Sequence, residues 1–436
     1  MPGATQFKLR SAISGHGQEG EFIPRNHTIR LNNSINYTRS VWKECADNAI
    51  YPQGGTWVYD RAGWCPGSAV DMKEYEITSN VTPGATINLD YSLPALVNPG
   101  QSNYRINNQL VSYSAPNFTL DAALNYIKTP SKRVEYQRIN PICNAPVVSI
   151  KNTGSITLTD LDITYGRVGG TLSVYHWTGS LAFLASAEIT LPAPNWMSSN
   201  TNYFIAVVSN PNGGVDQYYG NDTIISEFNG PVVFPSGIII DLLTNNYGGH
   251  TTYTLRDSQG NVLINQSGLL SNETYRDTFY LATDCYTVNL TDAGDDGLSW
   301  WANSSQGTGH FYIRDAATNV ILKNFNPDFG DNIYQQFTVN FALPVAENTV
   351  NEIKNFSLSP NPATSTARLT IELPVNTIAT IKLMNVLGEE LLTNTMRITT
   401  PVEIMNLDLS HIENGFYLVV LEAGNQHKMQ KLTISK

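Results

Sequence analysis

Short runs in which apolar and polar residues alternate dominate the chain. Examples are residues 7–13 (FKLRSAI), 27–31 (HTIRL) and 87–93 (INLDYSL). Because side chains on a strand point alternately to the two faces of a sheet, a period of two predicts strands with one buried face. Residues 120–127 (LDAALNYI) could be mistaken for a helix, but the run is short. The pattern predicts an all-β chain.

Changes in this pattern divide the chain into blocks. After residue 133, strands alternate with Asn-Thr-Gly and Gly-Gly turns about every eight to twelve residues, the spacing of an immunoglobulin-like sandwich. The next block has the turn-forming residues of successive hairpins, and a linker at 345–350 precedes about seven short strands. We therefore expect four β-sandwich domains, at residues 1–133, 134–233, 234–344 and 351–436.

Composition narrows the class of protein. Charged residues make up 14% of the chain and aromatic residues 10%, with 32 glycines, which is typical of secreted all-β modules. The net charge of -11 provides no basic stripe for phosphates, so nucleic acid and anionic membrane surfaces are not expected partners. Because the sequence has no run of about 18 apolar residues, we expect no membrane span.

The N-terminal sequence and the four cysteines bear on whether the chain is exported and whether it contains disulfides. No signal peptide is recognised, because Met1 leads directly into a predicted strand, and we expect an N-terminal part to be missing from this sequence. Cys45 and Cys65 lie within one block, and a bridge between them would stabilise the fold by about 3 kcal/mol. Cys143 and Cys285 lie in different blocks. We expect them to be buried and unpaired, and a bridge between modules is the alternative.

Residues 42–67 combine three tryptophans, two cysteines and four glycines in one segment. Within it, Pro52, Gly54 and Gly55 mark a tight turn. Trp57, Tyr59 and Trp64 flank Arg61, and aromatic rings beside a guanidinium suit sugars, which offer CH faces and hydroxyl groups. The alternative interpretation is a structural turn closed by a disulfide.

Two further segments carry acidic residues. In residues 14–27, Glu19 and Glu21 would share one side of an extended chain and could place a carboxylate in a cleft. The two histidines there lack the close spacing of a metal site. In residues 292–297, which we term the acidic turn, Asp292, Asp295 and Asp296 predict either a structural calcium site or a solvated turn. We expect no other cofactor.

The GHG turn, the GEFIPRNH segment and the pattern from Trp42 to Gly67 together resemble the C-terminal domain of the peptide-N-glycosidase F family, over residues 6–133. These enzymes hydrolyse the amide bond between Asn and the first N-acetylglucosamine of an N-glycan. The resemblance implies a jelly-roll sandwich that packs beside a second one, with the active site at their junction.

This resemblance assigns roles to individual residues. Glu21 matches an active-site glutamate, Arg61 a substrate-contacting arginine, and Cys45 with Cys65 a disulfide. We expect Trp57 and Trp64 to bind substrate beside Arg61. The family flanks its glutamate with two bridged cysteines, but this sequence has Glu19 and Ile23 there, which puts the rigidity of that turn in doubt. The family's principal catalytic aspartate belongs to the other sandwich, which is not matched here.

The remaining blocks resemble other secreted modules. Residues 134–233 are similar to adhesion-type sandwiches of bacterial surface proteins, and residues 234–344 to CUB-like modules of secreted hydrolases. Residues 351–436 carry the segments FSLSPNPA (356–363), IKLMNVLG (381–388) and NGFYLVVL (414–421). Together these segments closely resemble the type A C-terminal sorting domain of the type IX secretion system of Bacteroidetes. This last resemblance implies export across the outer membrane by that machinery, followed by release or attachment at the surface.

Two functions remain open at this stage. The chain could be the distal part of a secreted amidase for N-glycosylated proteins, inactive as printed because amide hydrolysis needs a further group to activate water. It could instead be a non-catalytic surface protein that binds glycans. A copper monooxygenase would share paired jelly rolls, but the sequence offers no matching set of ligands.

Overall fold

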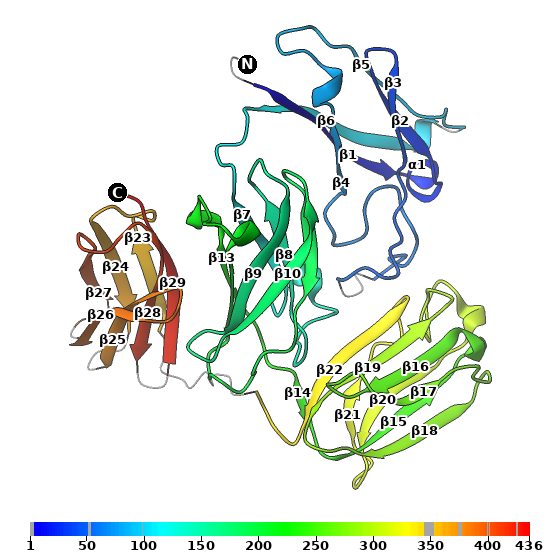
Figure 1. The fold of residues 1–436 in the computed structure, drawn as a ribbon. Coiled ribbons are helices and arrows are strands. Elements are labelled where there is room, and N and C mark those ends of the chain that lie inside the picture. The colour runs from blue at the N-terminus through cyan, green and yellow to red at the C-terminus, as the bar shows by residue number, and fades with distance from the viewer. Residues whose placement is uncertain are drawn as a thin grey trace. The chain divides into compact units, whose positions relative to one another are not determined.

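The structure is a computed structural model that describes residues 4–50, 54–97, 99–343, 353–373, 377–398, 400, 402–423 and 426–436. Pro52 and the expected linker at 345–350 lie outside the described residues. Nearly all regular structure is β-strand, arranged as sandwiches, which confirms the predicted fold class (Figure 1). The chain forms two compact units. The first comprises Met1–Asn117, Lys132–Cys143 and Pro231–Phe341, and the second comprises Phe118–Ser131, Asn144–Gly230 and Ala342–Lys436.

The first sandwich opens the first unit. It has the antiparallel sheets β4-β1-β6 and β3-β2-β5. Its strands are β1 (Gln6–His16), β2 (Asn26–Leu31), β3 (Ile35–Ser40), β4 (Met72–Glu76), β5 (Leu89–Ser92) and β6 (Asn103–Tyr113). Leu9 of β1 packs with Ile29 and Leu31 of β2 in the core, as the alternating pattern predicts. Helix α1 (Gln18–Phe22) lies where the sequence predicts a turn or an extended segment.

The third sandwich completes the first unit. It pairs a five-stranded sheet, β14-β22-β19-β16-β17, with a four-stranded sheet, β18-β15-β20-β21. The strands are β14 (Val232–Phe234), β15 (Gly237–Leu243), β16 (Thr251–Arg256), β17 (Val262–Gln266), β18 (Thr274–Tyr280), β19 (Cys285–Asp292), β20 (His310–Asp315), β21 (Ile321–Asn324) and β22 (Asn332–Val339). Its core is a continuous cluster of buried Ile, Leu, Val and aromatic side chains drawn from both sheets.

The second unit contains the middle and C-terminal sandwiches. The middle sandwich has sheets β10-β9-β12-β13 and β11-β8-β7. Its strands are β7 (Ala122–Thr129), β8 (Val147–Asn152), β9 (Leu158–Arg167), β10 (Ser173–Leu181), β11 (Ser186–Thr190), β12 (Tyr203–Ser209) and β13 (Thr223–Glu227). Because β7 pairs with β8, residues 118–131 belong to this sandwich and not to the first block, in which the sequence boundary at 133 placed them.

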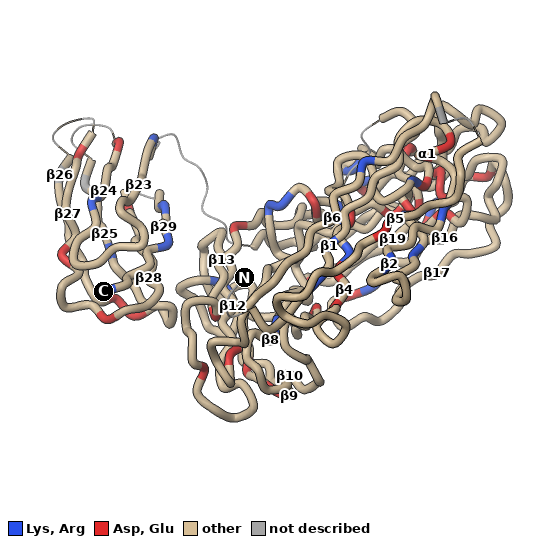
Figure 2. The backbone as a smooth tube through the Cα atoms, turned by 90° about the horizontal axis from the view of Figure 1, so that it is seen from above, with Lys and Arg blue, Asp and Glu red and all other residues tan. Residues whose placement is uncertain are grey.

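The C-terminal sandwich has sheets β23-β24-β27 and β26-β25-β28-β29. Its strands are β23 (Asn355–Ser359), β24 (Thr366–Glu372), β25 (Ile378–Asn385), β26 (Glu390–Arg397), β27 (Val402–Asp408), β28 (Gly415–Ala423) and β29 (Gln426–Ile434). Figure 2 shows acidic and basic positions interspersed along the chain. Within the described residues, no helix is both long enough and apolar enough to cross a membrane.

The segment 132–143 connects parts of the first unit. Cys143 forms a disulfide with Cys285 of β19, so the expectation that both cysteines are unpaired is wrong. The sequence could not predict this pairing, because the two cysteines are 142 residues apart and meet only when the chain packs. Arg138 is buried and donates hydrogen bonds to the carbonyls of Ala46 (3.1 Å) and Phe329 (2.8 Å). The segment therefore holds the first and third sandwiches together.

Candidate functional site

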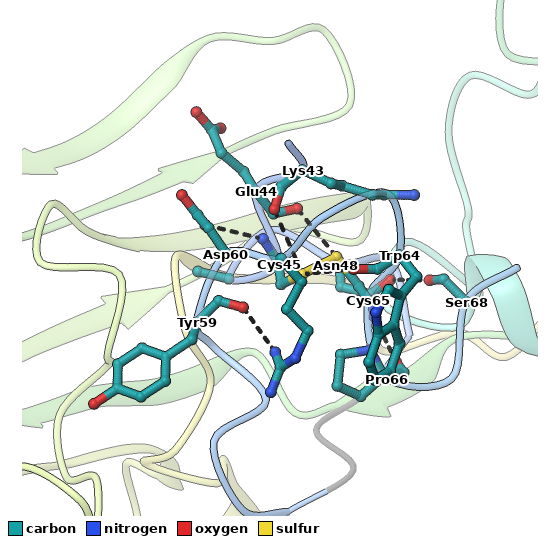
Figure 3. Close-up of a disulfide and its surroundings, with 12 residues drawn as sticks. Lys43, Glu44, Cys45, Asn48, Tyr59, Asp60, Trp64, Cys65, Pro66 and Ser68 are labelled. Atoms are coloured by element: carbon teal, nitrogen blue, oxygen red, sulfur yellow. Dashed lines mark hydrogen bonds between the residues drawn. A yellow bond between two sulfur atoms is a disulfide. The ribbon is translucent and has the colours of Figure 1, made fainter. Parts of the chain in front are cut away.

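The loop from residue 42 to residue 67 is closed by a disulfide between Cys45 and Cys65, whose Cα atoms lie 5.4 Å apart (Figure 3). The main-chain amide of Cys45 donates to Asp60, and Asn48 donates from its side chain to the Pro66 carbonyl at 2.9 Å. Main-chain hydrogen bonds also join Lys43 to Arg61 in both directions. The two ends of the loop are therefore fixed against each other.

Arg61 lies inside this loop and is only 4% exposed. Its Nε donates to Glu21 Oε1 at 2.8 Å. Its terminal nitrogens donate to the carbonyls of Thr56 (2.7 Å), Trp57 (3.2 Å) and Tyr59 (2.7 Å), and to the Thr56 hydroxyl (3.2 Å). Because charged donors form strong hydrogen bonds, the guanidinium fixes the loop and orients Glu21 at the same time. The structure thus joins two predicted site residues, although Arg61 itself is largely covered.

Glu21 stands in helix α1, and its side chain remains 16% exposed. The helix is attached to the loop because the Ala62 amide donates to the Glu21 carbonyl at 3.0 Å. A side chain at Gly15 would meet the Gly20 carbonyl oxygen at 1.9 Å, so only glycine permits this close approach. These contacts present the Glu21 carboxylate at the edge of the first sandwich.

A second ion pair fixes the turn in which the family has bridged cysteines. Glu19 is buried, pairs with Arg25, and accepts a hydrogen bond from the Val97 amide at 2.7 Å. In this chain, charge pairing supports the turn in place of a covalent bridge. Sequence reasoning missed this role of Glu19, although its position in the motif offered a signal.

The two predicted substrate-binding tryptophans lie in different environments. Trp57 is only 1% exposed, packs with Val58 and Trp300, and donates from Nε1 to Asp328 at 2.8 Å. Its ring faces are therefore covered by protein, contrary to the expectation that they face a ligand. Trp64 is half-buried and its ring lies 5.4 Å from the Arg61 guanidinium carbon. The substrate-binding role of Trp64 stays a prediction.

A cleft of about 1070 Å³ lies between the first and third sandwiches. Neither Glu21 nor Arg61 lines it, but its wall includes Phe22, whose ring centroid lies 5.1 Å from the Arg61 guanidinium carbon. Phe22 and Tyr59 line it from the first sandwich, and Trp300 lines it from the third. Tyr59 is 44% exposed and contacts Trp300 edge to face, with ring centroids 4.9 Å apart. The sequence identified Tyr59 as a neighbour of Arg61, but it gave no sign that the third sandwich contributes to the same cleft.

The acidic turn borders this cleft. Asp292 is buried and accepts main-chain hydrogen bonds from Asp296 (3.1 Å) and Gly297 (2.9 Å), and burial raises its pKa to about 6. Asp296 accepts from Asn303 at 3.0 Å. Partial burial is the main cause that raises the pKa of Asp295, and nearby negative charges raise it further. Across the described part of the chain, no three His, Cys, Asp or Glu side chains are grouped to hold a metal ion. Hydrogen bonds therefore account for Asp292 and Asp296, and calcium binding stays a prediction.

Comparison with known proteins identifies the first sandwich and the end of the chain. Residues 2–113 match the family described as "Peptide-N-glycosidase F, C terminal". Residues 357–435 match the family "Secretion system C-terminal sorting domain". These matches confirm the two resemblances on which the sequence analysis relied. A chain with this sorting domain is a secreted or cell-surface protein, and this one carries a glycosidase-F-like domain.

One relative is similar to the glycosidase-F-like domain. The peptide-N(4)-(N-acetyl-beta-D-glucosaminyl)asparagine amidase F of Elizabethkingia miricola is 34% identical over 104 residues, which cover 21% of this chain and 29% of the relative. The chain thus spans less than a third of the length of this relative. The family match itself ends at residue 113, before the middle and third sandwiches begin, so it covers only the first-sandwich side of the cleft.

Solved structures show only distant similarity. Dimeric latent PorU from Porphyromonas gingivalis has a TM-score of 0.21 and 11% identity, covering 75% of this chain and 35% of that chain. A tetra-tandem repeat from the extending region of a large adhesion protein has a TM-score of 0.17 and 13% identity, covering 97% of this chain and 94% of that chain. At these scores, the comparisons add nothing about function.

Proposed function

We propose that this secreted protein acts on N-glycosylated proteins, and that its glycosidase-F-like domain supplies Glu21 to an amidase site for the bond between Asn and N-acetylglucosamine. The observation that carries this proposal is the Glu21–Arg61 pair, with Nε and Oε1 2.8 Å apart, inside the segment that matches the family. The sorting domain delivers this site to the outside of the cell through the type IX secretion machinery.

The chemistry of the pair defines what it contributes. One Glu21 oxygen is held by Arg61, while the partly exposed carboxylate can still accept hydrogen bonds from sugar hydroxyl or amide groups. Amide hydrolysis also needs a group that activates water. The Glu21–Arg61 ion pair can supply orientation and charge, but not this group. We therefore propose that the chain as printed binds N-glycans without hydrolysing their amide bond.

A non-catalytic adhesion protein is the second candidate. The observation that favours it is the cleft with exposed Tyr59, because this feature supports binding and requires no reaction. Under this alternative, Glu21 contributes a hydrogen-bond acceptor to a glycan-binding surface.

Both candidates can be tested on the full chain. The purified protein is incubated with an N-glycosylated peptide, binding is measured by calorimetry, and released glycan is measured by mass spectrometry. We expect binding without release, and weaker binding by Glu21→Gln. Glu74→Gln is the control, because Glu74 is exposed on β4 of the same sandwich. Release that is lost in Glu21→Gln would establish an active amidase. Absence of both binding and release would overturn the proposed function.

A further inference from the structure

The cleft that Phe22, the neighbour of Glu21, helps to line is composite, because the glycosidase-F-like domain forms one wall and the third sandwich forms the other. Phe22, Tyr59 and Asp60 come from the first wall, whereas Asp295, Asp296 and Trp300 come from the second. The third sandwich lies outside the segment that matches the family. The family match therefore describes only one of the two walls.

Several hydrogen bonds fix the two walls of the cleft against each other. The Trp57 indole donates to Asp328 at 2.8 Å, and the indoles of Trp300 (3.3 Å) and Trp301 (2.9 Å) donate to the Gly55 carbonyl. The Arg138 guanidinium donates to carbonyls of both sandwiches. Since these groups are buried or hydrogen-bonded across the junction, the cleft is built into the first unit and does not depend on a ligand.

The chemistry of the walls suits a saccharide. Tyr59 offers an exposed ring, and its edge-to-face contacts with Phe22 (6.0 Å) and Trp300 (4.9 Å) hold that ring in place. Rings of this kind pack against the CH faces of sugars, while carboxylates accept hydrogen bonds from hydroxyl groups. Asp60 is already oriented, because Trp42 Nε1 donates to it at 3.2 Å. The cleft therefore combines a fixed aromatic platform with oriented acceptors.

The charge of the cleft restricts which saccharide fits. Three aspartates line it, and among the described residues that line it there is no Lys, Arg or His. The buried guanidinium of Arg61, which contacts the Phe22 ring of this wall, is paired with Glu21 and directs its remaining donors at loop carbonyls. A ligand with its own carboxylate would therefore meet like charges without a compensating cation, and like charges across an interface are strongly disfavoured.

We propose that the third sandwich completes a saccharide subsite of the Glu21 site, and that this subsite selects uncharged glycans over acidic, sialylated ones. Tyr59 supplies the aromatic surface on which a sugar ring packs. Asp60, Asp295 and Asp296 accept hydrogen bonds from sugar hydroxyl groups and repel a ligand that carries its own carboxylate. This inference rests on the proposed function, because it specifies the glycan class that the same site accepts.

One glycopeptide, measured before and after removal of its sialic acids, tests the subsite in the full chain. We expect the wild type to bind the desialylated form more tightly. A unit charge about 7 Å from a ligand carboxylate changes affinity about three-fold in water-like surroundings. Asp295→Asn should therefore reduce the ratio of the two affinities, desialylated over sialylated, by about that factor, because the sialylated form binds more tightly. Asn also tolerates the positive φ of 61° at this position. In Tyr59→Ala, both glycopeptides should bind about ten-fold more weakly, because losing the contact between the Tyr59 ring and the sugar costs about 1.5 kcal/mol of binding free energy.

Two variants outside the cleft serve as controls. Glu273→Gln removes one exposed charge from the third sandwich, which also carries Asp295, and Tyr280→Ala removes a ring that is 82% exposed. Both should bind like the wild type. Equal wild-type affinity for the two glycopeptides, or a preference unchanged by Asp295→Asn, would overturn the subsite while leaving the proposed function standing. If the wild type bound neither form, the proposed function itself would fail.

Discussion

Replacing Arg61 by alanine should loosen the loop at residues 54–65 far more than replacing an exposed arginine. The guanidinium makes five hydrogen bonds, one to Glu21 and four to loop carbonyl and hydroxyl oxygens. Removing one partner of a buried ion pair costs about 3–5 kcal/mol, because the other charge and the freed acceptors are left without a partner. The Arg61→Ala variant should therefore lose about this much free energy of local opening.

Amide hydrogen exchange, followed by mass spectrometry of peptides from this loop, measures that free energy directly. A loss of about 3–5 kcal/mol corresponds to exchange that is about 10²-fold to 4 × 10³-fold faster. The Glu21→Gln variant should lose less, about 1 kcal/mol, because the amide oxygen can still accept from Arg61 Nε. Arg30→Ala is the control, since Arg30 is exposed on β2. Exchange in Arg61→Ala within two-fold (about 0.4 kcal/mol) of the wild type would refute the assigned role.

Three further predictions concern stability. Replacing Cys143 and Cys285 by serine should destabilise the first unit by about 5 kcal/mol, against about 3 kcal/mol for the Cys45–Cys65 pair, because the longer loop loses more entropy when closed; equal shifts in denaturant midpoint would contradict this. In the second unit, burial and two neighbouring aspartates raise the pKa of Asp222 to about 8. The folded state thus keeps a proton that the unfolded state releases near pH 4, so this group's contribution to stability falls as pH rises from about 4 to 8; Asp222→Asn should flatten the decline of the thermal midpoint over that range, and an unchanged slope would exclude the group. Finally, if the acidic turn holds calcium, added calcium should raise the thermal midpoint of the chain, and an unchanged midpoint would remove that hypothesis.

The sequence predicted most strands correctly because each half-buried strand carries its own alternating pattern. The errors concern features that depend on distant partners. Helix α1 is five residues long and has no apolar period, so its conformation depends on contacts with the loop and on β1. Strand β7 was expected in the first block because sequence neighbours suggested it, whereas pairing with β8 places it in the middle sandwich.

The site shows the same division between local and distant information. The Cys45–Cys65 loop and the nearby Glu21 and Arg61 carry a motif that can be recognised along the sequence. The burial of Trp57 could not be predicted, because its partner Asp328 is 271 residues away. The cleft was missed for the same reason, since Tyr59 and Trp300 meet only after two sandwiches pack together.

The contact between Trp57 and Asp328 also sets an order of events during synthesis. The loop with Arg61 can close early, because Cys45 and Cys65 are only 20 residues apart. The Trp57 indole, however, finds its acceptor only after the middle sandwich and most of the third sandwich have been made. Until then a large apolar ring stays exposed on the nascent protein, and such surfaces promote aggregation. The first unit, which extends to Phe341, therefore reaches its final state only when more than three quarters of the 436-residue chain is available.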